Sequence, residues 1–442
     1  MTTILRARVA HTPRDPFAGS GALETFDDGA IAFDDAGVIV GVGEYAMVSR
    51  EHPNARTEDR SGCIALPGLI DTHVHFPQIA VIGAMGLQLL EWLDQRTLPE
   101  EAKMADPVHA DKTAKRFVNA LAANGTTSAL VFGAHFPHAQ QALFEAADAA
   151  GLRIASGLIV SDRNLRPDLH TTPDAAYGAS KALIERWHGH NRLRYAVTPR
   201  FSVSCTEAML DVCHTLLQET PGALFTTHVN ESPGEIAFVK ELFPEARDYV
   251  DTYGRAGLLN ERSVLAHNVH VSDEELRHLK ATDTAIAHCP SSNAFLASGI
   301  FPMVRHVEAG VRFGMGTDVG AGTGLSMLKE GLVAYHVQMI REQGHLLGPA
   351  HLLYLATSAG AKAIGLDDVC GDFTPGKQAD VALIEAPPDS TLEAVLEDAP
   401  DWEATLGAVF TLAREECVVE TRVAGEIVFA REAWSLKHAG GA

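Results

Sequence analysis

The sequence lacks the features that mark several large classes of protein. It has six cysteines in 442 residues, and no two of them form a CxxC pair, so neither a zinc ribbon nor a disulfide framework is indicated. No apolar run approaches the roughly 18 residues of a membrane span. The opening segment MTTILRARVAHTPRD has no long apolar stretch like that of a signal peptide. From these absences we expect a cytoplasmic protein.

Positive charge is also scarce. Lys and Arg number 35 against 57 Asp and Glu, which gives a formal net charge of −22. Nucleic acids and anionic membranes are themselves negatively charged, so we expect neither as a partner. A small uncharged or cationic substrate is compatible with this charge, although an acidic surface also serves solubility alone. With 46% hydrophobic and 21% charged residues, the composition is that of a globular protein and excludes a mostly disordered chain.

The two ends of the chain share an alternating pattern of apolar and polar residues, which predicts strands. The predicted terminal strands are residues 2–10, 29–44 with a turn at 34–37, 379–386, 408–413 and 417–430. We expect both ends to pair into one small β-sandwich domain, made of residues 1–63 and 370–442. Near this junction Gly371–Gln378 almost matches a phosphate-binding loop, but Gln378 replaces the required hydroxyl and a strand pattern follows, so we interpret it as a turn.

The middle of the chain, residues 64–369, has a different pattern of apolar residues. Short β-branched runs alternate with amphipathic helical patterns, which is typical of βα units around a parallel sheet. The predicted strands are 64–75, 127–133, 153–159, 193–198, 223–228, 263–267, 284–288 and 311–317. Eight strands over roughly 250 residues predict a distorted (β/α)8 barrel of the TIM type.

Four of these strands end in residues that bind metals. Because functional side chains of such a barrel lie at the carboxyl ends of its strands, we expect these residues to meet. They are His73 and His75, two positions apart and therefore on one side of the first strand, with His228, His267 and Asp318. Imidazoles with one carboxylate suit Zn²⁺, or Fe²⁺. Any one of the 21 histidines is more readily a surface residue, so the hypothesis depends on the coincidence of four strand ends.

Glu231 follows His228 by three positions. A carboxyl group just beyond a ligand strand could move protons beside a metal-activated water. The alternative is that Glu231 caps the helix predicted to begin directly after it. Its position alone leaves both interpretations open.

Several motifs resemble a known family. The segment PGLIDTHVH at 67–75 resembles the first-strand signature of the amidohydrolase superfamily. More specific motifs resemble those of guanine deaminases, and together they cover nearly the whole chain. They are HFPQ at 75–78, LEWL at 90–93 with PE at 99–100, TPRF at 198–201 with Cys205, HVNE at 228–231, HCPSSN at 288–293 and GTDVG at 316–320.

The resemblance implies a fold, a metal and a reaction. It implies one catalytic metal ion, usually zinc, in a homodimeric enzyme that hydrolyses guanine to xanthine and ammonia. The implied metal ligands are His73, His75, His228, His267 and Asp318. The implied catalytic residues are Glu231, Asp318 and His267, and the implied substrate contacts are Gln78, Arg200 and Phe201, with His228, Glu231 and Asp318.

The sequence departs from the family pattern at two places, and rival functions remain open. Residues 95–99 read QRTLP where an aromatic residue is usual, and Ala294 stands where a larger residue is common. The fourth strand ends without the lysine that bridges two metals in related ring amidases, which favours one metal. The nearest alternative is another mononuclear deaminase acting on cytosine, an adenosine-type ring, 8-oxoguanine or a triazine. A rival from a different class is a non-catalytic scaffold of the same fold. Such a protein would not need to keep all five metal ligands, and this sequence has all five.

Overall fold

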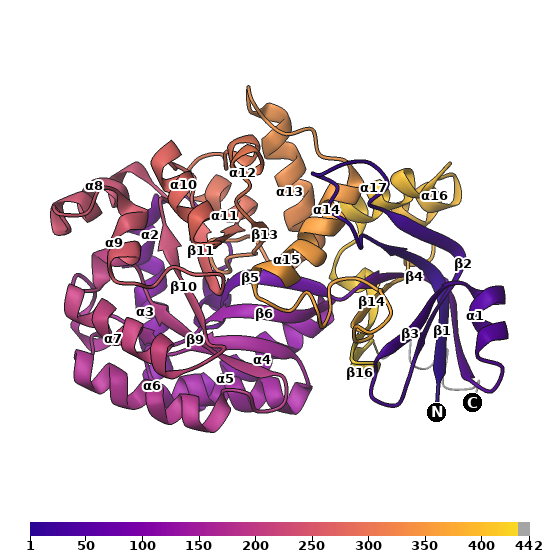
Figure 1. Cartoon of the computed structure of the whole chain (residues 1–442), viewed down its shortest axis with the longest axis horizontal. Coiled ribbons are helices and arrows are strands. Elements are labelled where there is room, and N and C mark those ends of the chain that lie inside the picture. The colour runs from indigo at the N-terminus through magenta and orange to yellow at the C-terminus, as the bar shows by residue number, and fades with distance from the viewer. Residues whose placement is uncertain (432–442) are drawn as a thin grey trace.

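The computed structural model describes residues 1–431 and contains two sheets (Figure 1). The first is a nearly closed barrel of parallel strands in the order β13-β12-β11-β10-β9-β7-β6-β5, with β8 paired to β9. Its strands are β5 (Leu69–His75), β6 (Thr126–Phe132), β7 (Arg153–Gly157), β8 (Ile159–Val160), β9 (Leu193–Pro199), β10 (Leu224–Val229), β11 (Ser263–His267), β12 (Ala285–His288) and β13 (Phe313–Met315). The predicted (β/α)8 barrel is confirmed.

The barrel closes where its first and last strands meet. The Thr72 hydroxyl donates to the carbonyl of Met315 at 2.8 Å, and the backbone N–H of Asp318 donates to the carbonyl of His73 at 2.8 Å. These contacts bring the segment after β13 against the end of β5. The closure thereby places residues more than 200 positions apart at one rim.

Helices surround the barrel and begin where the sequence supplies caps. The N-cap of α10 is Ser272, whose hydroxyl accepts from the N–H of Glu275 while the Glu275 carboxylate accepts from the N–H of Ser272. The helices are α1 (Tyr45–Glu51), α2 (Leu89–Trp92), α3 (Leu98–Ala102), α4 (Pro107–Ala123), α5 (Pro137–Ala150), α6 (Pro173–Trp187), α7 (Glu207–Glu219), α8 (Pro233–Leu242), α9 (Tyr249–Arg255), α10 (Asp273–Ala281), α11 (Pro290–Phe295), α12 (Met303–Ala309), α13 (Met327–Ile340), α14 (Pro349–Ala356), α15 (Ser358–Ala363), α16 (Thr391–Glu397) and α17 (Trp402–Leu412). Shorter helical turns are η1 (Phe76–Val81), η2 (Leu93–Thr97), η3 (Lys103–Ala105), η4 (Pro167–Leu169), η5 (Ser202–Ser204) and η6 (Glu415–Cys417).

The second sheet draws on both ends of the chain, as the indigo and yellow strands of Figure 1 show. Its seven strands run in the order β16-β15-β14-β4-β1-β2-β3 and form one hydrogen-bonded path. They are β1 (Thr3–His11), β2 (Glu24–Phe33), β3 (Ile39–Glu44), β4 (Arg56–Pro67), β14 (Val381–Ile384), β15 (Val418–Val423) and β16 (Glu426–Ala430). The last eleven residues of the predicted domain range 370–442 lie outside the described part of the chain.

The predicted strand 64–75 is two strands that serve different sheets. Its first part lies in β4, and β5 begins at Leu69. Gly68 separates them at a point where a Cβ atom would lie 2.2 Å from the Thr127 hydroxyl oxygen. Only glycine lets the backbone pass that closely, so the chain changes sheet there.

The prediction of a strand at 408–413 is wrong, because these residues lie in and just after helix α17. The Asp401 carboxylate accepts from an N–H of the first turn of this helix. Leu406 and Phe410, four positions apart, are both buried and therefore share one face. That face packs towards α13 and α14. Helical capping and burial override the β-branched composition of the segment.

Two further sequence expectations concern loops and membranes. Gly371–Gln378 forms a turn followed closely by β14 rather than by a helix. The segment therefore resembles a phosphate-binding loop in sequence but not in structure. Within residues 1–431, no helix is both long enough and apolar enough to cross a membrane.

Candidate active site

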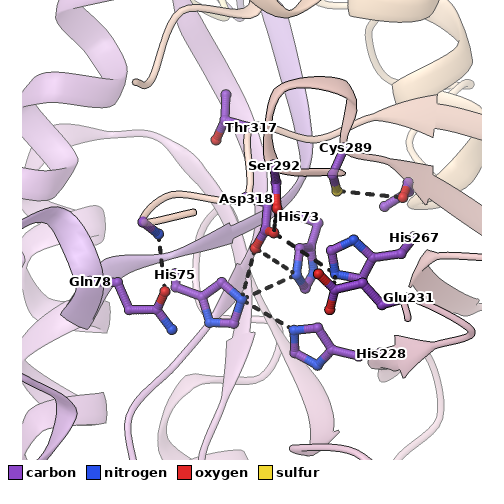
Figure 2. Close-up of polar contacts among 12 residues, drawn as sticks. His73, His75, Gln78, His228, Glu231, His267, Cys289, Ser292, Thr317 and Asp318 are labelled. Atoms are coloured by element: carbon purple, nitrogen blue, oxygen red, sulfur yellow. Dashed lines mark hydrogen bonds and ion pairs between the residues drawn. The ribbon is translucent and has the colours of Figure 1, made fainter. Parts of the chain in front are cut away.

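The predicted metal ligands meet at the carboxyl ends of the barrel strands (Figure 2). His75 is the last residue of β5, and His73 stands two positions before it on the same side of the strand. His228 lies near the end of β10, and His267 ends β11. Asp318 follows β13 by three residues. All five side chains are buried or nearly so, and they project towards one point in Figure 2.

Distances among their donor atoms are short and regular. His75 Nε2 lies 3.2 Å from His73 Nε2 and 3.3 Å from His228 Nε2. Asp318 Oδ1 lies 3.3 Å from His73 Nε2 and 3.2 Å from His75 Nε2. Ligands about 2.0–2.1 Å from one tetrahedral zinc ion would be ~3.4 Å apart. His267 stands slightly further out, with Nε2 at 3.8 Å from Asp318 Oδ2. The donor set therefore fits one ion of zinc size.

Hydrogen bonds hold the outward side of three of these five side chains. His228 Nδ1 donates to the backbone carbonyl of Arg200 at 2.7 Å, and His267 Nδ1 donates to Asn293 Oδ1 at 3.0 Å. A proton on Nδ1 leaves the lone pair on Nε2 facing the centre, which is the tautomer that binds metals. Asp318 Oδ2 accepts from the Ser292 hydroxyl at 2.6 Å, which fixes the carboxylate.

Burial acts in opposite directions on the pKa of the imidazoles and of the carboxylate at this centre. It lowers the pKa of His75 to about 4 and that of His228 well below its usual range, so both imidazoles are neutral at pH 7. Burial alone would raise the pKa of Asp318, but hydrogen bonds from His73 and His75 hold it well below its usual range. Neutral imidazoles beside an ionised carboxylate are the forms that bind a divalent cation.

The backbone at these strand ends is constrained. His267 has φ of 74° and Asp318 has φ of 47°, both in the left-handed region that non-glycine residues rarely adopt. Such conformations persist where surrounding structure holds them, and they gather at functional sites. Gly316 permits the approach, since a Cβ there would lie 2.9 Å from the Cβ, N and O atoms of His73.

Glu231 points into the site and does not cap a helix. The cap of α8 is formed by Ser232, with Glu235 as its capping-box partner. Glu231 Oε2 lies 3.5 Å from His267 Nε2, and its Oε1 accepts from the Ser298 hydroxyl at 3.2 Å. Burial, with the charge of Asp318, raises the pKa of Glu231 to about 8, so the carboxyl group carries a proton at neutral pH.

A pocket opens beside this centre. The three residues that the resemblance assigned to the substrate, Gln78, Arg200 and Phe201, all line it. Its remaining lining residues are His75, Leu89, Trp92, Leu93, His228, Glu231, Glu235, His267, Leu296, Asp318 and Ala321. Acid–base groups thus lie at one side of a pocket with apolar walls, which is the usual composition of a small-molecule site.

Sequence reasoning missed the residues that hold this site in place. Glu101 binds both Gln78 and Arg200, although it lies 23 and 99 positions from them. Phe132, at the end of β6, packs its ring 4.7 Å from that of His75 and 4.6 Å from that of His228. Ser292 and Asn293 contact Asp318 and His267. Both residues lie in the HCPSSN motif, which is the one sequence feature that could have pointed to them.

Comparisons with known proteins agree with this geometry. The model of the amidohydrolase family matches residues 64–428. The chain belongs to the amidohydrolase family. It is 54% identical over 435 residues to a probable guanine deaminase of Deinococcus radiodurans, covering 97% of this chain and 99% of the relative. It is 38% identical over 424 residues to the guanine deaminase of Escherichia coli, covering 96% of each.

Solved structures of this family superpose over nearly the whole chain. E. coli guanine deaminase matches with a TM-score of 0.94 and 37% identity, covering 97% of this chain and 100% of that one. A guanine deaminase from C. acetobutylicum with guanine bound in its active site matches with a TM-score of 0.90 and 26% identity, covering 97% and 100%. The resemblance to guanine deaminases within the amidohydrolase family is therefore confirmed.

Proposed function

We propose that this protein is a guanine deaminase, which hydrolyses guanine to xanthine and ammonia. One observation carries the proposal: the five candidate metal ligands and Glu231 converge beside a pocket lined by Gln78, Arg200 and Phe201. The relatives support it, since guanine deaminases align with this chain over almost its full length.

The proposed cofactor is one zinc ion, and Fe²⁺ would suit the same donors. His73, His75, His228, His267 and Asp318 would hold it, as supported by the donor distances of 3.2–3.8 Å among them. When bound, zinc would lower the pKa of water from 15.7 to about 7, which supplies hydroxide at neutral pH.

Proton transfers fall to two carboxyl groups of the chain. Asp318 is placed to accept the proton of the attacking water. Attack at the guanine C2 atom saturates that carbon only if a ring nitrogen gains a proton, so Glu231 delivers one to N3 and later helps to expel ammonia. His267, 3.5 Å from Glu231, is the third proposed catalytic residue and would contact the charge that develops on the attacking oxygen.

The pocket residues match the edges and face of a purine. Arg200 has only donors and suits the O6 carbonyl, whereas Gln78 offers a donor and an acceptor to the ring edge. Phe201 supplies an apolar ring face for stacking. Leu89, Trp92 and Leu93 supply apolar walls of the pocket.

Three organisational proposals accompany this function. Residues 64–369 form the catalytic barrel domain, and 1–63 with 370–442 form the small domain, as far as the described residues reach. The family resemblance supports a homodimer, and the sequence composition supports a cytoplasmic location. Gel filtration with light scattering tests the dimer.

The experiment that tests the function measures ammonia release from a panel of ring amines. The panel contains guanine, adenine, cytosine, 8-oxoguanine and ammeline, and metal is quantified on the same sample. We expect guanine to give the highest kcat/KM, with about one metal ion per chain. A higher kcat/KM for another ring would assign the enzyme to that substrate, and a metal-free protein without activity would support the scaffold instead.

A further inference from the structure

Glu101 takes no part in the chemical steps described above, yet it is among the most buried acids of the described chain. It lies in the short helix α3, is 1% exposed, and is not among the metal-ligating groups. Its two oxygens receive hydrogen bonds from three side chains. Gln78 Nε2 donates to Oε1 at 2.7 Å, Arg200 Nη1 lies 2.8 Å from both oxygens, and His135 Nε2 lies 3.2 Å from Oε2.

We propose that Glu101 is a positioning residue that fixes the Gln78 amide and the Arg200 guanidinium in one orientation, and so determines which ring edge the pocket accepts. This inference rests on the proposed function for the identity of the ring. It assigns to one carboxylate the control of the two polar side chains proposed to bind the ring edge, Gln78 and Arg200.

The amide of Gln78 is held at both ends. An amide presents an oxygen and an NH2 group of nearly the same shape, so it can bind in two orientations with opposite hydrogen-bonding patterns. Glu101 can only accept, and the backbone N–H of Gly320, 3.0 Å from Gln78 Oε1, can only donate. Together they allow one orientation. One N–H of Gln78 and one oxygen lone pair are left for the ring.

Arg200 needs Glu101 as its counter-ion. Its side chain is 3% exposed, and a guanidinium cannot be buried there without an opposite charge. Among residues 1–431, its hydrogen bonds to side chains all come from Nη1, so Nε and Nη2 keep their donors for a ligand. These donors favour a ring that offers a carbonyl oxygen, such as guanine O6, and oppose one that offers an amino group there, such as adenine.

The charge of Glu101 is secured by its neighbours. Burial by itself would raise the pKa of Glu101, but the positive charge of Arg200 and the hydrogen bond from His135 hold that pKa well below its usual range. The carboxylate is therefore ionised throughout the neutral range. An amide at this position would keep the shape and lose the charge.

The variant Glu101→Gln tests the inference directly. The glutamine amide keeps one oxygen, which can accept from Gln78 and Arg200. Its NH2 group takes the place of Oε2, where the donors of Arg200 and His135 lie, and the negative charge that balances Arg200 is lost. Loss of a hydrogen bond to a charged group corresponds to about a 10- to 100-fold effect. We expect KM for guanine to rise within that range while kcat falls less, and the kcat/KM preference for guanine over adenine to narrow. Metal content should be that of the wild type.

Controls separate positioning from simple stability. Glu100→Gln changes the preceding acid, which pairs with Lys103 and does not line the pocket, and should leave KM and the preference unchanged. Glu101→Asp keeps the charge with a shorter reach, so it should restore part of the guanine affinity. In a Gln78→Ala background, Glu101→Gln should raise KM by a smaller factor than in the wild type, because one of its targets is already absent.

The outcomes are distinguishable. A folded Glu101→Gln protein with wild-type KM and wild-type preference would overturn the inference, and so would loss of folding in both Glu101→Gln and Glu101→Asp, since Glu101 would then be a structural ion-pair partner. Failure of the proposed function looks different: wild-type protein would release no ammonia from guanine. The comparison would then use the ring amine that wild-type protein does deaminate, or guanine binding measured by calorimetry.

Discussion

Replacing Glu231 by glutamine removes the proposed proton donor with little change of shape. The side chain is 5% exposed, lies 3.5 Å from His267 Nε2, and accepts from the Ser298 hydroxyl. A glutamine keeps an oxygen for Ser298 but cannot give a proton to the ring or carry one to the leaving amine. General acid–base catalysis contributes about 10²–10⁴-fold, so kcat should fall by at least ~10²-fold. That factor corresponds to about 2.7 kcal/mol of activation free energy.

The assay for this variant is steady-state ammonia release from guanine, with the metal quantified in each preparation. Metal content should equal that of the wild type, because Glu231 is not among the five proposed ligands. Glu241→Gln is the matched control, since Glu241 is an exposed acid on the helix that follows Glu231 and should leave kcat unchanged. Near-normal turnover by a metal-replete Glu231→Gln enzyme would refute the proton-shuttle reasoning.

Three further variants probe the pocket, the metal centre and a remote acid. Arg200→Ala should lower kcat/KM for guanine by about 10- to 100-fold. Because it leaves the Glu101 carboxylate without its counter-ion, it should also lower the free energy of unfolding in urea by about 3–5 kcal/mol. Unchanged kcat/KM would show the pocket assignment to be wrong. Gly316→Ala places a Cβ 2.9 Å from His73 atoms, so bound metal should fall and activity should drop by up to about 10²-fold; wild-type metal content would contradict this. Burial raises the pKa of Glu330 to about 8 from an ordinary value of 4.5, so the folded protein keeps a proton that the unfolded chain releases. Unfolding free energy should therefore fall between about pH 5 and pH 8 by up to about 1.4 kcal/mol per pH unit, and Glu330→Gln should lessen that slope in urea unfolding at several pH values; an unchanged slope would count against a protonated Glu330.

Much of the fold follows from local pattern. The barrel strands are short β-branched runs between amphipathic helices, and this alternation is visible without tertiary information. The ends of β5 and β11 were located closely because His75 and His267 stand at the point where each apolar run stops. The error at 408–413 has a local cause as well: the capping carboxylate of Asp401 lies seven residues before the segment that looked like a strand.

The site also contains residues that the sequence predicts and residues that it does not. Metal ligands can be predicted because a barrel places the ends of its strands at one rim, so residue type and strand position suffice. The role of Glu101 could not be predicted from the sequence. Its contacts join α3 to Gln78 in η1 and to Arg200, which directly follows β9, and only the folded chain brings these segments together. Its sequence signal is faint: an acid three positions after Leu98 shares the buried face of that residue.

The most direct test of the central claim is the location of the metal. Anomalous scattering at the zinc and iron edges, from crystals grown with guanine or xanthine, would show where an ion binds. We predict one peak about 2.0–2.3 Å from His and Asp donor atoms at the ends of β5, β10, β11 and β13, with the purine against Arg200 and Phe201. No peak among His73, His75, His228 and Asp318 in protein that turns over guanine would contradict the account.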